Sequence, residues 1–196
     1  MALATLADVK QQLDIPTSDT KQDSRLTLYI NAATQAIETY CGRTFDVATR
    51  TEYHDGDLSN AILSREWPII SISELWVDPT RSFTDTTYQL SAPDYLIQGD
   101  SRITFTNLIT PRVSGSIKLV YSAGYATIPP DLNLACIWLV EWFQYHRNRQ
   151  DMGRTNASKG DESIGILAEA PKMILQLLNP YRNNRSGPDY SMMRRV

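Results

Sequence analysis

Two histidines, His54 and His146, supply the imidazoles available for acid–base chemistry or metal binding. His54 begins the run His54-Asp55-Gly56-Asp57, whose imidazole and carboxylate groups are of the kinds that bind divalent metal ions. These candidate ligands all lie in one turn-like run, and no second cluster of His or Cys at metal-ligand spacing accompanies them. We therefore interpret the run as a hydrated hairpin turn. A metal-dependent hydrolase or nuclease centred on His54 is the alternative that this run leaves open.

Nucleophilic and phosphate-binding signatures are missing from the sequence. The motifs GxSxG, GxGxxG and GxxxxGK[ST] do not occur, and the segment from Gly153 to Lys159 follows an expected helix instead of a strand. Cys41 and Cys136 lie in apolar helical patterns without a basic neighbour that would activate a thiolate, which indicates two buried free thiols. We expect no catalytic residue, no metal and no cofactor.

Positive charge gathers in two places. The first surrounds a polar loop at 150–163 and consists of Arg147, Arg149, Arg154 and Lys159. These residues could contact DNA phosphates or a neighbouring subunit, although a solvated helix end and loop is the simpler interpretation. The second place is 180–196, which carries net +3 in a chain of net charge -3, so the remainder carries -6. Its composition is typical of a segment that folds on a partner.

Residues 1–43 have helical periodicity. Thr5 followed three residues later by Asp8 is typical of a helix N-terminus. A second helix is expected from about residue 24 to Cys41, with apolar residues at spacings of three and four, and Gly42 supplies its stop.

The apolar period changes from 3.6 to 2 within residues 44–127. Runs that alternate apolar and polar residues lie at 70–77, 102–105 and 117–121. Turn signals such as Asp55-Gly56 and Ser114-Gly115 separate them. The pattern predicts several short antiparallel strands with at least one buried face.

Residues 128–180 return to helix. Pro129-Pro130-Asp131 is a helix-start signal, and the residues from 132 to 145 are apolar nearly all round, so we expect this helix to be packed on several sides. Trp138 and Trp142 are four residues apart on it, which is typical of core positions. A last helix is expected at about 171–178.

These zones predict an α+β fold. We expect a mainly helical core of about four helices, with a long central apolar helix and an antiparallel β-rich insertion between the second and third helices. Residues 1–180 are interpreted as one domain, comprising helical 1–43, β-rich 44–127 and helical 128–180. Residues 181–196 are interpreted as a basic tail.

Composition favours a globular protein that works outside membranes. Apolar residues make up 42% and charged residues 21% of the 196 residues. The most apolar stretch contains Glu141 and is shorter than the roughly 20 residues needed to cross a bilayer. The N-terminus does not have the pattern of a signal peptide. We expect a cytosol-like compartment.

Five segments in a fixed order carry a family resemblance. They are LADVKQQLDI, DSRLTLYINAATQAIETYCGRTF, REWPIISISELWV, IKLVYSAGYATIPPDLNLACIWLVEWFQYHRNR and LAEAPKMILQLLNPYR. Over about residues 3–183 the chain resembles the head–tail connector (adaptor, head-completion) proteins of tailed phages. The fourth segment, with its Tyr-x-Ala-Gly-Tyr and Ile-Pro steps before a long apolar helix, is the most specific.

The resemblance implies a structural virion protein of the neck, between capsid and tail, which is assembled in the host cytoplasm. Such proteins form a ring, expected here to hold twelve copies, beneath the portal protein. The ring extends the DNA channel and provides the docking surface for a head-closure (stopper) or tail protein. Genomic DNA passes through it without sequence-specific recognition.

Within this interpretation the tail is the expected portal-docking element, because tyrosine, methionine and arginine are favoured as interface anchors. The predicted docking residues are Tyr181, Arg182, Arg185, Tyr190, Met192, Met193, Arg194, Arg195 and Val196. The loop residues Arg147, Arg149, Arg154 and Lys159 are predicted to face another subunit or the DNA channel. The alternative is a DNA-binding module that uses 147–159 and the tail.

Overall fold

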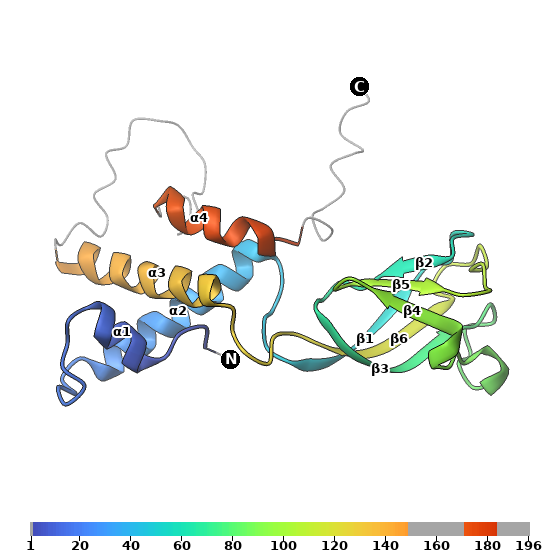
Figure 1. Cartoon of the computed structure of the whole chain (residues 1–196), viewed down its shortest axis with the longest axis horizontal. Coiled ribbons are helices and arrows are strands. Elements are labelled where there is room, and N and C mark those ends of the chain that lie inside the picture. Colours follow the sequence, from blue (N-terminus) through green and yellow to red (C-terminus); the bar gives the residue numbers. More distant parts are fainter. Residues whose placement is uncertain (1, 149–170, 184–196) are drawn as a thin grey trace, which may run out of the picture. The chain divides into compact units, whose positions relative to one another are not determined.

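The computed structural model describes residues 2–148 and 171–183 and has an α+β fold, which confirms the predicted class (Figure 1). In chain order, helices α1 and α2 are followed by strands β1 to β6 and then by helices α3 and α4. The chain divides into two compact units. The helical unit combines the residues up to Arg43 with those from Thr127 onward, and the β unit spans Thr44–Ala126.

Helices α1 (Leu6–Gln12) and α2 (Asp23–Cys41) belong to the helical unit. The Thr5 hydroxyl accepts a hydrogen bond from the Asp8 N–H at 3.2 Å, and the Asp8 carboxylate accepts one from the Thr5 N–H at 3.4 Å. This capping box starts α1. Gly42 ends α2 with φ 65°, a left-handed conformation that glycine adopts without Cβ strain. Both predicted helix boundaries are confirmed.

The connection between α1 and α2 closes around a buried lysine. The ammonium of Lys10 donates hydrogen bonds to the carbonyls of Thr17, at 3.4 Å, and Asp19, at 2.9 Å. It also lies 2.5 Å from the carboxylate of Asp23, and the Lys10 side chain is only 4% exposed. Because a buried charge needs partners to compensate for lost hydration, this group joins α1, the connecting loop and the first turn of α2.

Helix α3 (Pro130–Asn148) contacts α1, α2 and α4 (Lys172–Leu178). A 3-10 turn, η4 (Asn179–Tyr181), continues α4. The buried residues of α3 repeat at helical spacing and include Leu132, Ala135, Cys136, Leu139, Val140 and Phe143. Cys41 and Cys136 are buried free thiols, as predicted, and burial raises their pKa values to about 12 and about 11 respectively.

The β unit contains two antiparallel sheets. One has the strand order β1-β6-β3 and the other the order β2-β5-β4. The strands are β1 (Ala48–His54), β2 (Ala61–Leu63), β3 (Ile69–Val77), β4 (Tyr95–Gln98), β5 (Arg102–Phe105) and β6 (Ile117–Ala123). Short 3-10 turns, η1 (Thr86–Tyr88) and η2 (Ala92–Asp94), lie between β3 and β4. The strands predicted at 70–77, 102–105 and 117–121 are confirmed as parts of β3, β5 and β6.

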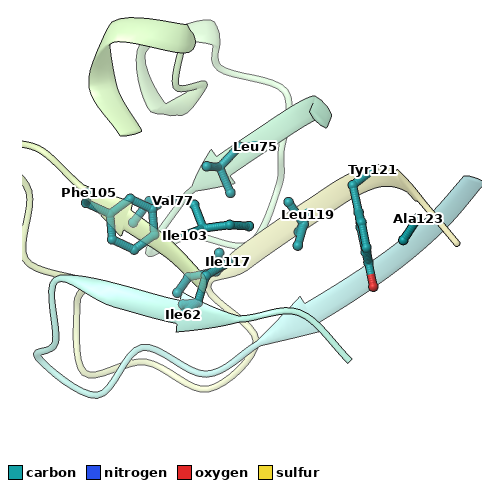
Figure 2. Packing of buried hydrophobic residues seen from close by; sticks show 9 residues of the cluster. All are labelled: Ile62, Leu75, Val77, Ile103, Phe105, Ile117, Leu119, Tyr121 and Ala123. Carbon is teal, nitrogen blue, oxygen red and sulfur yellow. The ribbon is translucent and has the colours of Figure 1, made fainter. Parts of the chain in front are cut away.

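A single apolar cluster draws residues from both sheets (Figure 2). Strand β6 contributes alternate residues, because successive side chains of a strand point to opposite faces. The buried members of the cluster are Ile62, Leu75, Val77, Ile103, Phe105, Ile117, Leu119, Tyr121 and Ala123. This cluster is the core that the period of 2 predicted.

Asp78 organises the loop that follows β3. Its buried carboxylate accepts hydrogen bonds from the backbone N–H groups of Thr80, Ser82 and Phe83, at 2.7, 3.0 and 2.8 Å. Burial raises the pKa of Asp78, but these hydrogen bonds and those from the Thr80 and Ser82 hydroxyls outweigh it. They hold that pKa well below its ordinary value.

Candidate functional site

Residues 179–183, here called the tail root, fasten the C-terminal part of the described chain to the helical unit. The Tyr181 hydroxyl donates to both carboxylate oxygens of Asp131, each at 2.7 Å. The N–H of Asn183 donates to the carbonyl of Cys41 at 2.6 Å. The tail root is therefore bonded to the last residue of α2 and to the first turn of α3.

Tyr40 supports the same segment from a second side. Its hydroxyl donates to the side-chain oxygen of Asn179 at 3.2 Å, and its ring lies 5.0 Å below the guanidinium of Arg182. This separation is within the range of cation–π attraction. Ile174 and Leu178 of α4, which precede the tail root in the sequence, are buried. Apolar burial thus holds α4, and polar contacts hold the residues that follow it.

Two of the predicted docking residues, Tyr181 and Arg182, are described by the structure. Tyr181 is half-buried against its own chain, whereas Arg182 is exposed. Sequence reasoning missed the Tyr181–Asp131 bond, because its partners are 50 residues apart and nothing local links them. The other predicted docking residues lie outside the described residues: Arg185, Tyr190, Met192, Met193, Arg194, Arg195 and Val196.

The predicted basic loop falls almost wholly outside the described residues. Arg147 lies in the last turn of α3. Arg149, Arg154 and Lys159 fall in 149–170, which the structure does not describe.

An apolar groove of about 290 Å³ lies between α3 and the start of α4. Its walls are formed by Trp138, Glu141, Trp142, Tyr145, Pro171, Met173 and Ile174. The expectation that Trp138 and Trp142 are core residues is wrong, since both are half-buried and line this groove. Their four-residue spacing correctly places them on one face of α3, but spacing does not reveal what covers that face.

The run that begins at His54 is hydrogen-bonded to the loop that precedes β6. The Asp55 carboxylate accepts hydrogen bonds from the Ser114 hydroxyl and the Gly115 N–H, each at 2.6 Å. A Cβ on Gly56 would lie 1.7 Å from the carbonyl oxygen of Pro111, so only glycine fits this approach. The interpretation as a hairpin turn is wrong, because the run connects β1 of one sheet to β2 of the other. Among the described residues, no group of three or more His, Cys, Asp or Glu is placed to hold a metal ion.

Glu52, on β1, is a buried carboxylate with several donors around it. The Tyr121 hydroxyl donates to it, the Nε2 atom of His54 lies 2.9 Å away, and the N–H of Arg65 donates at 3.1 Å. Burial raises the pKa of Glu52, but the contacts with His54, Tyr121 and Arg65 outweigh it and lower the pKa overall. Burial and the nearby Glu52 carboxylate raise the pKa of Tyr121 far above its ordinary value. The network links β1 to β6 and to the loop that precedes β3.

In the part of the chain that the structure describes, none of the helices is both long enough and apolar enough to span a bilayer.

Three solved structures share the fold. The first is described as the neck of an empty GTA particle computed with C6 symmetry, with 19% sequence identity and a TM-score of 0.53. The second is the neck of a native GTA particle computed with C12 symmetry, with 18% identity and a TM-score of 0.50. The third is the virion of a native gene transfer agent particle, with 17% identity and a TM-score of 0.54. Each match covers 90% of this chain and 87% of the other. At these identities the likeness concerns the fold alone.

A family model described as "Head completion protein" matches residues 2–184, whereas no curated protein gives a significant match. The matched family is one of structural proteins of the virion. The chain belongs to the head completion protein family. This membership confirms the resemblance to head–tail connectors and, with it, the predicted structural role at the junction of head and tail.

Proposed function

We propose that the protein forms a ring in the neck of the virion, between the portal and the next neck or tail component. The observation that carries this proposal is the head completion match over residues 2–184. The shared fold supports it, because the similar chains come from particle necks computed with C12 and C6 symmetry. A head-to-tail contact repeated around an axis closes into a ring, and we propose twelve copies.

In this proposal residues 1–180 act as one connector. The helical unit, with α3 as its long apolar helix, is the frame, and the β unit is an insertion that the frame carries. The ring extends the DNA channel, and DNA passes without sequence-specific contacts. The proposed role is structural, and membership of the head completion protein family supports it.

We assign portal docking to the tail after the tail root. Arg182 is exposed where this segment begins, and its guanidinium is held by Tyr40 on one side. The residues that follow are rich in arginine, methionine and tyrosine, which are favoured as interface anchors. Arg147, Arg149, Arg154 and Lys159 are assigned to a contact with a neighbouring subunit or with the channel.

Electron microscopy of the purified protein, with and without the portal ring of the same virus, tests the proposal. We expect a closed ring on the portal, with twelvefold symmetry. A variant that ends at Asn183 keeps the tail root and is expected to fold but not to bind the portal. A monomer in the presence of portal would contradict the ring, and full portal binding by the shortened variant would contradict the assignment of docking to the tail.

Duplex DNA affinity separates this function from the DNA-binding alternative. DNA must slide through a channel, so we expect binding weaker than micromolar at physiological salt. Nanomolar affinity that falls steeply as salt is raised would favour a DNA-binding module instead.

A further inference from the structure

We propose that Tyr181 is a positioning residue for partner docking: its bond to Asp131 fixes the point at which the tail leaves the helical unit. The inference rests on the proposed docking of the tail. In this inference Tyr181 does not itself contact the portal. It positions the tail residues that do. The hydroxyl that would be available to a partner is already used on both oxygens of Asp131.

The tail root is bonded at one particular end of the helical unit. Cys41, which accepts from Asn183, stands two residues before the chain passes into the β unit after Arg43. Asp131, which accepts from Tyr181, stands four residues after the chain returns at Thr127. The tail root is therefore bonded to the helical unit close to the two points at which the chain passes between the helical unit and the β unit.

A fixed starting point favours docking for an entropic reason. A segment tethered at a defined position searches a smaller volume, so its effective concentration at a nearby partner is higher. Release of the tail root would give residues 179–183 conformational freedom that docking must remove. The contacts of Tyr181, Arg182 and Asn183 remove that freedom before the partner arrives.

The substitution Tyr181→Phe isolates this role, because it deletes one hydroxyl and keeps the half-buried ring. We expect the melting temperature to stay within about 3 °C of the unmodified protein, since one hydrogen bond changes stability only modestly. We expect faster hydrogen exchange of the Asn183 amide, which is bonded to Cys41, and about fivefold weaker binding to the portal ring. Tyr29→Phe is the control, because the Tyr29 ring packs on Phe143 in the same unit and Tyr29 stands twelve residues before Cys41 on α2.

Asp131→Asn provides a second route to the same contact. If the two groups act through one bond, the double variant with Tyr181→Phe weakens portal binding no more than the stronger single variant does. Additive losses would overturn the pairing. Faster exchange at Asn183 with unchanged portal affinity would overturn the positioning role, as would unchanged exchange.

The variant that ends at Asn183 separates failure of this inference from failure of the proposed function. If that variant binds the portal fully, docking by the tail is wrong and the positioning role falls with it. If it loses binding while Tyr181→Phe retains full affinity, the tail docks and only the positioning role is wrong.

Discussion

The Tyr121 hydroxyl donates a hydrogen bond to the buried carboxylate of Glu52, and this bond joins β6 to its neighbour β1. The two residues are 69 positions apart in the sequence. Both are buried, and the Tyr121 hydroxyl also accepts from the N–H of Glu66 at 3.1 Å. The β unit thus has a buried polar network beside its apolar cluster, and we expect the network to contribute to folding stability.

Glu52→Gln is expected to lower the free energy of unfolding by about 2 kcal/mol. The carboxamide presents an NH₂ group where the carboxylate accepted bonds, so one of the surrounding donors loses its acceptor. Urea denaturation at pH 7 measures the effect. Glu74→Gln is the control, since the Glu74 side chain, which bonds to Lys118, is 41% exposed against 7% for Glu52, and it should cost much less. Equal losses for the two variants would contradict the importance of the buried network.

Stability should fall as the solution becomes acidic. The pKa values of Glu52 and Asp78 are lowered in the folded protein, so each carboxylate contributes stability that is fully present above its unfolded pKa, about 4. That contribution is lost as the pH falls from this value through the lowered folded pKa. Urea denaturation at pH 7, 5, 4 and 3 should show the loss below about pH 4.5. The Glu52→Gln variant should show a shallower decline, and an identical profile would exclude Glu52 as a source.

Lys10→Met is expected to destabilise the helical unit by about 3 kcal/mol. The methionine fills a similar volume but leaves the carboxylate of Asp23 and the carbonyls of Thr17 and Asp19 without their donor. Thermal and urea unfolding followed by circular dichroism at 222 nm measure the change. Lys21→Met, at an exposed position, should be nearly neutral. A neutral Lys10→Met would mean that apolar packing replaces the buried charge group fully.

Gly56→Ala and Gly99→Ala form a matched pair. The new methyl group at Gly56 would meet the Pro111 carbonyl oxygen at 1.7 Å, so we expect a loss of about 3 kcal/mol. Gly99 has φ 62° and nothing within 4 Å of an added Cβ. The only expected cost is therefore that of holding alanine in a left-handed backbone conformation, about 1 kcal/mol. Denaturation of both variants should rank them in this order, and the reverse order would show that the loop at Pro111 yields easily.

Local signals predicted much of the fold. The capping pair Thr5 and Asp8 and the glycine at 42 act within one turn of helix. The helix ends that they set can therefore be predicted from the sequence. The period of 2 at 117–121 is equally local and marks β6. Strands β2 and β4, with three and four residues, are too short to give a period and were not predicted individually.

Contacts between distant residues account for what the sequence did not predict. The pairing of Tyr181 with Asp131 requires α4 to lie on α3, and no pattern in either segment encodes that partner. The same limit applies to Trp138 and Trp142, whose exposure depends on the neighbours of α3 and not on their own spacing. The hairpin interpretation of the His54 run failed because strand pairing, β1 with β6, is decided at long range.

The bond between Asn183 and Cys41 has a consequence for the order of events during synthesis. The β unit is one continuous stretch, so its whole sequence emerges from the ribosome before any residue of α3 emerges. The helical unit is formed by two separate parts of the chain. Helices α1 and α2 therefore cannot complete their packing until α3 and α4 have emerged. On the ribosome the inserted unit can therefore fold first, and the frame closes only after residue 183 has been released.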